Sequence, residues 1–369
     1  MSAHGNSRPC AAKQGVSGEA PLKGFRRPSW WQCRFLKLFV LLASASALAG
    51  AAPLERSFWV HASLGLFTQR NYFGTNFPAT AAPTQPQVEK AARLLTQSCA
   101  ANRLYLIYHR EMPTEDARRV FDWWRQACPK EVEIIPALVL RMYDRAQTTV
   151  FATNELAALA EFFHDQINPH QLAIYDIYAR RDQGKALAVL AQKFPSGLIR
   201  VGLQPGEPLE QPFVAAVEDT WSALCHGTDN ERDWQQPGFG AETLQKWVLA
   251  RHASPRPIAW DLVTVAWDYT ATKRGSYPGY DDANKNMPLP AGRNRAALKI
   301  IREAAHAPPL AGFSSDLYIL QENSRSTPHD GRTKSFYECL KRGEDYRGYY
   351  DVPFQEIVTL YRELRDRGE

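Results

Sequence analysis

The chain has 369 residues, of which 44% are hydrophobic and 22% are charged, with 25 Pro and 22 Gly. This balance is typical of a globular protein, and it excludes a disordered, collagen-like or coiled-coil chain and a disulfide-dominated mini-protein. The formal net charge is +5, but residues 1–49 hold seven Lys or Arg against one Glu, so the remainder carries −1. A near-neutral remainder without a basic run indicates no nucleic-acid partner.

Residues 1–49 are predicted to be a secretory signal peptide. Basic residues precede the apolar run 38–42, and small residues, mostly Ala and Ser, surround the expected cleavage site at 47–49. The apolar run is shorter than the roughly 20 residues that span a bilayer. We therefore expect a mature protein that begins near Gly50, is secreted or periplasmic, and has no stable membrane insertion after cleavage.

Four cysteines follow the leader: Cys99, Cys128, Cys225 and Cys339. An even number in an exported chain is compatible with two disulfides. Cys99 and Cys128 end the apolar stripes of two successive predicted helices, so we expect them to lie near one another. The alternatives for this pair are a disulfide bond and two buried thiols.

From residue 57 onward, short apolar runs alternate with amphipathic helical patterns, which is typical of βα units around a parallel sheet. Several runs are apolar on successive residues, as strands covered on both faces should be. The expected strands are 57–63, 104–109, 132–140, 172–177, 198–203, 257–264 and 311–319. The expected helices are 85–100, 114–127, 153–167, 183–194, 241–252, 293–305 and 353–367.

Segment 213–219 fits either a strand or a helix. Its short separation from the strand before it favours a helix, because a parallel crossover normally needs a dozen or more residues. A strand would complete a barrel of eight, and we favour that interpretation. Because no Gly-rich phosphate loop follows any strand, the fold class we predict is α/β, a single (β/α)8 TIM-type barrel over residues 50–369, irregular around 204–226.

The active site of such a barrel lies at the C-terminal ends of its strands, where this sequence places acids and aromatic residues. Asp176 interrupts the fourth apolar run, Asp261 ends the run from Pro257, and Glu218 ends the disputed segment. Glycoside hydrolysis needs two carboxyl groups across the bond that is cleaved. We predict Asp176, Asp261 and Glu218 as catalytic candidates. The alternative for Asp176 is a structural ion pair with Arg141 or Arg180.

Polar and aromatic side chains near these acids are the expected substrate-binding groups, because aromatic rings stack on sugar rings. They are His109, Arg141, Trp260, Trp267, Asp268 and Tyr269. No H-x-H, H-E-x-x-H, P-loop or G-x-S-x-G pattern occurs, so we predict no metal and no cofactor.

Across residues 57–367, this arrangement of units and strand-end residues resembles exported barrel-type glycoside hydrolases. The resemblance implies hydrolysis of a poly- or oligosaccharide substrate. Two alternatives remain, a carbohydrate-binding barrel without catalysis and a metal-dependent hydrolase. Carboxyl groups about 5–10 Å apart favour the glycoside hydrolase, whereas aromatic residues without opposed acids favour the carbohydrate-binding barrel. Clustered His and Asp residues favour the metal-dependent hydrolase.

Overall fold

The computed structural model divides the chain into two compact units, Met1–Ala52 and Pro53–Glu369. The predicted leader lies outside the described residues, all of which belong to the second unit. The structure describes residues 53–64, 82–108, 114–139, 141–143, 148–150, 153–175, 183–194, 216–218, 241–250, 257–262, 265–267, 286–288, 291–304, 310–317, 336–345 and 351–369.

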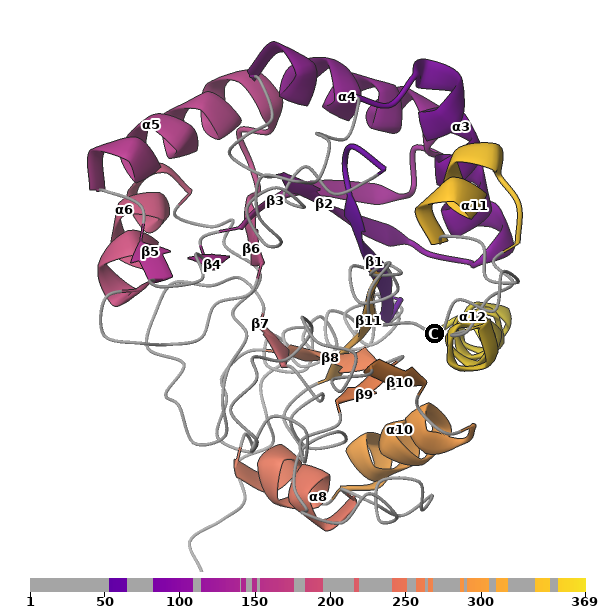
Figure 1. Cartoon of the computed structure of the whole chain (residues 1–369). Coiled ribbons are helices and arrows are strands. Elements are labelled where there is room, and N and C mark those ends of the chain that lie inside the picture. Colours follow the sequence, from indigo (N-terminus) through magenta and orange to yellow (C-terminus); the bar gives the residue numbers. More distant parts are fainter. Residues whose placement is uncertain are drawn as a thin grey trace, which may run out of the picture. The chain divides into compact units, whose positions relative to one another are not determined.

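A seven-stranded sheet with only parallel pairings forms the centre of this unit (Figure 1). The strand order is β6-β3-β2-β1-β11-β8-β7, so the first strand pairs with the last one. This order is cyclic in sequence, as it is in a barrel. The strands are β1 (Glu55–His61), β2 (Arg103–Tyr108), β3 (Glu133–Val139), β6 (Ala173–Tyr175), β7 (Ala216–Glu218), β8 (Ile258–Leu262) and β11 (Leu310–Asp316).

The sheet is therefore a parallel α/β half-barrel whose two ends are β6 and β7. The expected strand 198–203 falls between these two strands in the sequence, but it lies outside the described residues. A closed barrel of eight strands stays a prediction. The strand interpretation of segment 213–219 is confirmed, because β7 lies within it and pairs with β8.

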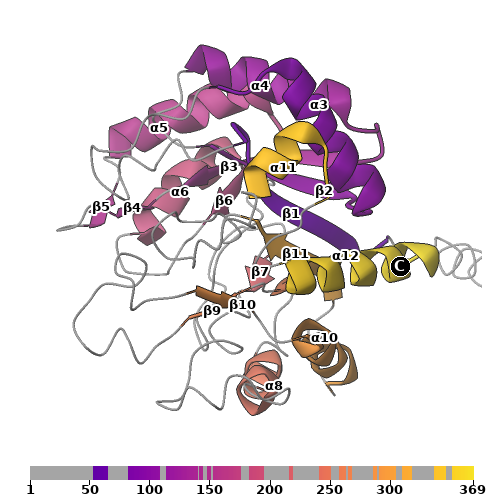
Figure 2. The ribbon, with the colours of Figure 1, turned by 45° about the vertical axis from the view of Figure 1, so that its right-hand side comes forward.

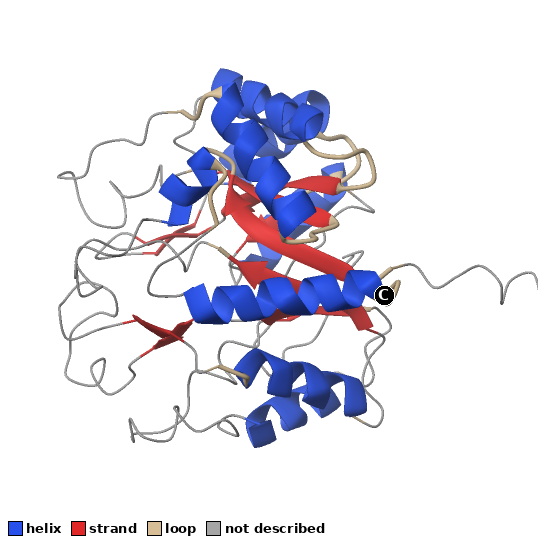
Figure 3. Cartoon of the chain, turned by 90° about the vertical axis from the view of Figure 1, so that its right-hand side faces the viewer, coloured by secondary structure: helices blue, strands red, loops and turns tan. Residues whose placement is uncertain are grey.

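Helices lie outside the strands, as Figures 1 and 3 show. Except for α11, the described helices occur at the predicted places, and α3 and α5 continue into the π-helical turns η1 (Leu94–Ser98) and η2 (Phe163–Ile167). The helices are α3 (Gln85–Arg93), α4 (Thr114–Ala127), α5 (Thr153–Phe162), α6 (Gln183–Lys193), α8 (Ala241–Ala250), α10 (Arg293–Glu303), α11 (Phe336–Arg342) and α12 (Asp351–Asp366).

Local sequence signals explain where helices begin. The backbone N–H of Thr84 donates to Oε1 of Gln87 at 2.9 Å, and Pro86 occupies the first turn of α3. Glu115 and Asp116 stand in the first turn of α4, where carboxylates stabilise the positive end of the helix.

One helix and two hairpins were not predicted from the sequence. Helix α11 packs against α3, as Figure 2 shows, and two short antiparallel hairpins follow strands β3 and β8. The hairpins join β4 (Arg141–Tyr143) to β5 (Thr148–Val150) and β9 (Val265–Trp267) to β10 (Asn286–Pro288). Hairpins after strands enlarge the loops in which barrel enzymes carry their specificity.

The strands alternate their side chains between two hydrophobic clusters. Phe58, Leu104, Trp260 and Phe313 pack with helix residues in the larger cluster, which defines the convex face of the sheet. The smaller cluster defines the concave face: Trp59, Tyr105, Ile107, Ile135, Ala137, Ala173 and Ala259. Each fully buried large apolar side chain contributes about 1.5–3 kcal/mol to folding.

Gly312 allows the last strand to approach the first one. Its φ is +149°, and a Cβ at this position would lie 2.2 Å from the carbonyl oxygen of Glu55. The pairing of β11 with β8 is also irregular here, between Leu310 and Gly312. Close contact of the two strands therefore requires glycine.

Cys99, Cys128 and Cys339 are buried free thiols, so the disulfide alternative for Cys99 and Cys128 is wrong. Burial raises the pKa of Cys99 and of Cys128 to about 12, which keeps both protonated and unreactive. Cys225 lies outside the described residues. Among the helices that the structure describes, none combines the length and the apolar character needed to cross a membrane.

Candidate functional site

Polar residues lie side by side on the concave face of the sheet, although both faces are buried. The strand register pairs Asp261 with Ser314, Ser314 with Ser57, Ser57 with Arg103, and Arg103 with Glu133. Register partners share a face, so one polar row crosses five strands from β8 to β3. The row begins at the N-terminal ends of β3 and β2, with Glu133 and Arg103, and reaches the fourth of the five residues of β8 at Asp261.

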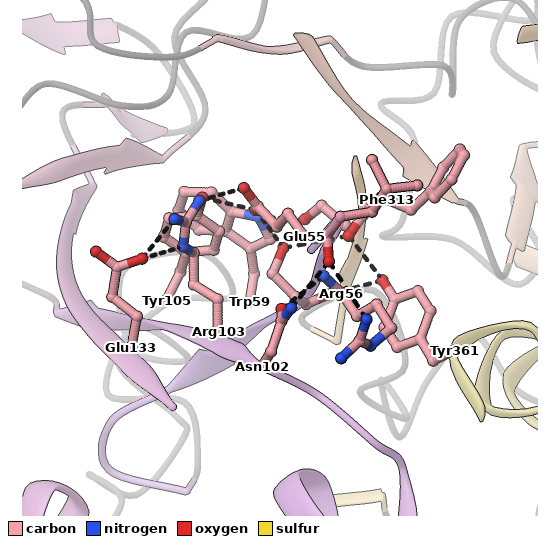
Figure 4. Close-up of polar contacts among 12 residues, drawn as sticks. Glu55, Arg56, Trp59, Asn102, Arg103, Tyr105, Glu133, Phe313 and Tyr361 are labelled. Atoms are coloured by element: carbon pink, nitrogen blue, oxygen red, sulfur yellow. Dashed lines mark hydrogen bonds and ion pairs between the residues drawn. The ribbon is translucent and has the colours of Figure 1, made fainter. Parts of the chain in front are cut away.

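The N-terminal part of the concave face is built around the carboxylate of Glu55 (Figure 4). Glu55 is 5% exposed, and its Oε1 accepts hydrogen bonds from Ser57 Oγ at 2.6 Å and from Tyr105 OH at 2.7 Å. Arg103 forms an ion pair with the other carboxylate oxygen. Glu55 therefore has the partners that a buried charge requires.

Arg103 extends this network to Glu133, to which its Nε donates at 2.6 Å. Burial alone would lower the pKa of Arg103, but Tyr105, Glu55 and Glu133 raise it above its ordinary value. Burial, reinforced by Glu55, raises the pKa of Tyr105 well above its ordinary value. Arg103 therefore stays charged and Tyr105 stays neutral. At the N-terminal end of barrel strands, such a network supports stability rather than catalysis.

An aromatic stack connects this network to the upper part of the concave face. The rings of Trp59 and Tyr105 lie 3.9 Å apart at 10°, which is a stacked arrangement. Trp59 Nε1 donates to Ser314 Oγ at 2.6 Å. Contacts thus run continuously from Glu55 through the two rings to Ser314, the register neighbour of Asp261.

Asp261 brings a carboxyl group to the C-terminal part of this face. It is the fourth of five residues in β8 and is 3% exposed. Its register partner Ser314 is 0% exposed. Its depth on this face, close to the C-terminal end of its strand, makes Asp261 the described acid that we carry forward as a candidate for chemistry.

His61 ends β1 at the same end of the sheet and was not predicted as a site residue. It pairs with Ile107 of the concave cluster, and its backbone N–H donates to Tyr337 OH at 3.1 Å. The rings of His61 and Tyr337 meet edge to face at 5.6 Å. The turn that follows contains Leu64 at φ +50°, an uncommon conformation that is typical of functional turns.

Trp260 and Asp261 were assigned to one site in the sequence analysis, but they face opposite sides of the sheet. Trp260 is 1% exposed and packs in the convex cluster under the helices, because it precedes Asp261 on the same strand. A sugar-stacking ring needs an accessible face, so Trp260 is left out of the site proposed below. Glu218 pairs with Trp260 rather than with Asp261.

The remaining predicted residues are placed only by their backbone or lie outside the described residues. Arg141 begins β4 and Trp267 ends β9, so each belongs to a hairpin that follows a strand of the sheet. Outside the described residues lie Asp176, His109, Asp268 and Tyr269. Asp176 is nevertheless the residue after Tyr175, with which β6 ends.

Within the described ranges, no group of three or more His, Cys, Asp or Glu residues is arranged to hold a metal ion. The residues that sequence reasoning missed are Glu55, Trp59, His61, Arg103, Tyr105 and Ser314. Both faces of their strands carry polar as well as apolar residues or large apolar residues in succession, so no regular alternation in the sequence indicates which side chains face inward.

No protein family matches the chain, and no curated protein matches it either. Solved structures match with low scores. A structure of AmyP in complex with maltose is 9% identical, with a TM-score of 0.42, over 85% of this chain and 78% of that one. N-acetylneuraminate lyase from Mycoplasma synoviae is 10% identical, with a TM-score of 0.34, over 64% of each chain, which is less than two thirds of the lyase.

A truncated 3-deoxy-D-arabino-heptulosonate 7-phosphate synthase from Thermotoga maritima is 11% identical, with a TM-score of 0.32, over 86% of this chain and 91% of that one. All three TM-scores are below 0.5, and the three proteins have different activities. These similarities therefore carry no argument about the function of this chain.

Proposed function

We propose that this chain is a glycoside hydrolase that uses Asp261 and Asp176 as its carboxyl pair on a poly- or oligosaccharide. The observation that carries the proposal is the buried carboxyl of Asp261 on the concave face of β8, close to the C-terminal end of the strand. In barrel enzymes, catalytic groups come from the C-terminal ends of several strands.

The strand order supports Asp176 as the partner. Strands β6 and β8 belong to one cyclic sheet, and Asp176 directly follows β6. Closure through residues 198–203 would leave two strands between β6 and β8, so that their C-terminal ends would line the same mouth of the barrel. Glu218 ends β7 and stays the third carboxyl candidate.

The chemistry needs two roles from this pair. One carboxyl group protonates the oxygen of the leaving sugar, while the other attacks the anomeric carbon or activates a water molecule. Arg141 and Trp267, in the hairpins β4–β5 and β9–β10, are proposed to bind the sugar with His109, Asp268 and Tyr269. We also propose cleavage of the leader and export, which amino-terminal sequencing of protein recovered from the periplasm or medium tests.

The test is release of reducing ends from a panel of starch, xylan, cellulose, β-1,3-glucan and chitin. We expect the wild type to hydrolyse one of them, and Asp261→Asn to lower turnover by about 10²–10⁴. Glu133→Gln is the matched control, because it removes a carboxylate from the N-terminal end of the sheet and should leave turnover unchanged. Hydrolysis of no glycan, or full turnover by Asp261→Asn, contradicts the proposal.

Binding without hydrolysis is the second outcome that the panel distinguishes. Affinity electrophoresis in gels containing each polysaccharide detects a carbohydrate-binding barrel, which would retain binding in both variants. That result would replace the hydrolase by the non-catalytic alternative.

A further inference from the structure

We propose that Ser314 and Trp59 are positioning residues for Asp261, in which the Trp59 indole orients the Ser314 hydroxyl so that its proton is directed to the Asp261 carboxylate. This inference rests on the proposed function, since it assigns supporting residues to the carboxyl group placed there.

The first step is the place of Ser314 beside Asp261. The two residues are register partners on the neighbouring strands β11 and β8, and register partners lie on one face about 4.8 Å apart. The pair Gly312–Ala259 precedes them on the same face, and Ala259 belongs to the concave cluster. The Ser314 hydroxyl and the Asp261 carboxyl therefore share the interior of the sheet.

The second step is the orientation of the hydroxyl group. Trp59 Nε1 donates to Ser314 Oγ at 2.6 Å, so the indole occupies one acceptor site of this oxygen. A serine hydroxyl also has one proton to donate. The indole on one side restricts rotation of the Ser314 hydroxyl. Of the acceptors that the strand register brings beside it, the Asp261 carboxylate would form the strongest hydrogen bond with the hydroxyl proton.

The third step is the rigidity of Trp59. Its ring is 0% exposed and stacks on Tyr105, which donates to Glu55, the ion-pair partner of Arg103. The carbonyl oxygen of Trp59 also accepts a hydrogen bond from the N–H of Leu317 at 3.0 Å. A fully buried ring that stacks on a hydrogen-bonded tyrosine, on a backbone fixed by its strand neighbours, holds Ser314 in one place, which is what positioning a reacting group requires.

A hydrogen bond from Ser314 stabilises the ionised form of the Asp261 carboxyl more than the neutral form. It also holds the oxygen atoms in one orientation, which matters because reacting atoms must be aligned.

The kinetic test compares two adjacent serines. Ser314→Ala should lower kcat about tenfold or more on the glycan that the wild type hydrolyses, with KM unchanged, because a hydrogen bond to a charged group is lost. Ser314→Thr keeps the hydroxyl and should restore most of the rate. Trp59→Phe keeps the stack on Tyr105 but removes the N–H, so it should lower kcat in the same direction.

Ser315→Ala is the matched control. Ser315 is also 0% exposed, but it pairs with Leu262 of the convex cluster. A kcat for Ser314→Ala equal to that of Ser315→Ala overturns the inference, whatever their melting temperatures.

A thermodynamic cycle tests the inference without any glycan. Ser314→Ala and Asp261→Asn, alone and together, should be non-additive by a factor of about two or more in the unfolding equilibrium constant. Ser315→Ala with Asp261→Asn should be additive. An additive Ser314 cycle overturns the inference.

The two measurements separate two kinds of failure. If the wild type hydrolyses no glycan, the proposed function fails, and the cycle still decides whether Ser314 acts on Asp261. If Ser314→Ala does not fold, Trp59→Phe replaces it in the cycle.

Discussion

The carboxylate of Glu55 is buried inside the half-barrel. Hydrogen-bond donors from β1 and β2 offset the free-energy cost of burying it. Ser57 and Tyr105 donate to one oxygen, and Arg103 pairs with the other. Removing such a charge leaves its donors without an acceptor of equal strength.

We expect Glu55→Gln to lower the free energy of unfolding by about 1.5–3 kcal/mol, because hydrogen bonds to a charged acceptor are lost while Arg103 keeps Glu133. Urea unfolding measures this change. Asp116→Asn is the control, since Asp116 pairs with the exposed Arg119 on α4 and should cost no more than about 1 kcal/mol. Equal losses in both variants would contradict the account of the network.

At single positions, the sequence did not show which side chains of a strand face inward. Trp260 and Asp261 were both assigned to the site, yet consecutive strand residues face opposite sides of a sheet. Because the run from Pro257 is apolar on both faces, the sequence alone offers no sign of which residue faces inward. The register with β11 supplies that information.

At the scale of elements, β1 and β11 meet where Gly312 removes a side chain. We expect Gly312→Ala to destabilise the fold by about 1–3 kcal/mol, because its Cβ would overlap the backbone of Glu55 and its φ is unfavourable for alanine. Gly292→Ala is the matched control, since Gly292 has φ +84° but no atom within 4 Å of the added Cβ. Thermal unfolding of the two variants should show the larger loss at Gly312, and the reverse order would contradict this reason.

Helices α10 and α12 are joined by a carboxylate. Glu356 of α12 accepts hydrogen bonds from the N–H groups of Gly292 and Arg295 at 3.3 and 3.2 Å, at the start of α10. Arg295 also donates to both carboxylate oxygens of Glu363 at 3.1 and 3.0 Å. Side chains from α12 thus replace a cap within α10 itself.

This junction predicts a pH dependence of stability. Burial raises the pKa of Glu356 above its ordinary value, although the two N–H groups partly offset it. The folded state therefore binds the Glu356 proton more tightly than the unfolded chain does. The stabilisation that this gives is full below the pKa of Glu356 in the unfolded chain, and it is lost as the pH rises through the pKa of Glu356 in the folded state. The test measures the free energy of unfolding of the wild type and of Glu356→Gln across this pH range. The wild type should lose stability relative to Glu356→Gln as the pH rises, and a gain relative to the variant would contradict this account.

Helices and strands were predictable because caps and apolar periodicity mark them. The sequence predicted α4 at its exact bounds, and the strand in segment 213–219 is present as β7. Helix α11 was missed, because its seven residues are too few to show a helical period clearly. The hairpins were missed because their strands have three residues each.

For the whole molecule, the cyclic strand order is the main structural finding, since it makes β1 and β11 neighbours. The sequence predicted a barrel from the alternation of units, and the structure describes a half-barrel of seven parallel strands. We propose that residues 198–203 complete the barrel between β6 and β7. The interior network was not predictable, because it depends on the register of five strands.

The measurement that tests the central claim most directly is turnover per folded molecule for Asp176→Asn, Asp261→Asn and the double variant. The account predicts that each single variant loses about 10²–10⁴ in turnover and unfolds cooperatively. The double variant should have a turnover only slightly below that of the less active single variant, because paired catalytic groups act as one unit. An Asp176→Asn protein that loses about 3–5 kcal/mol of stability yet keeps its turnover would show a structural ion pair instead and contradict the claim.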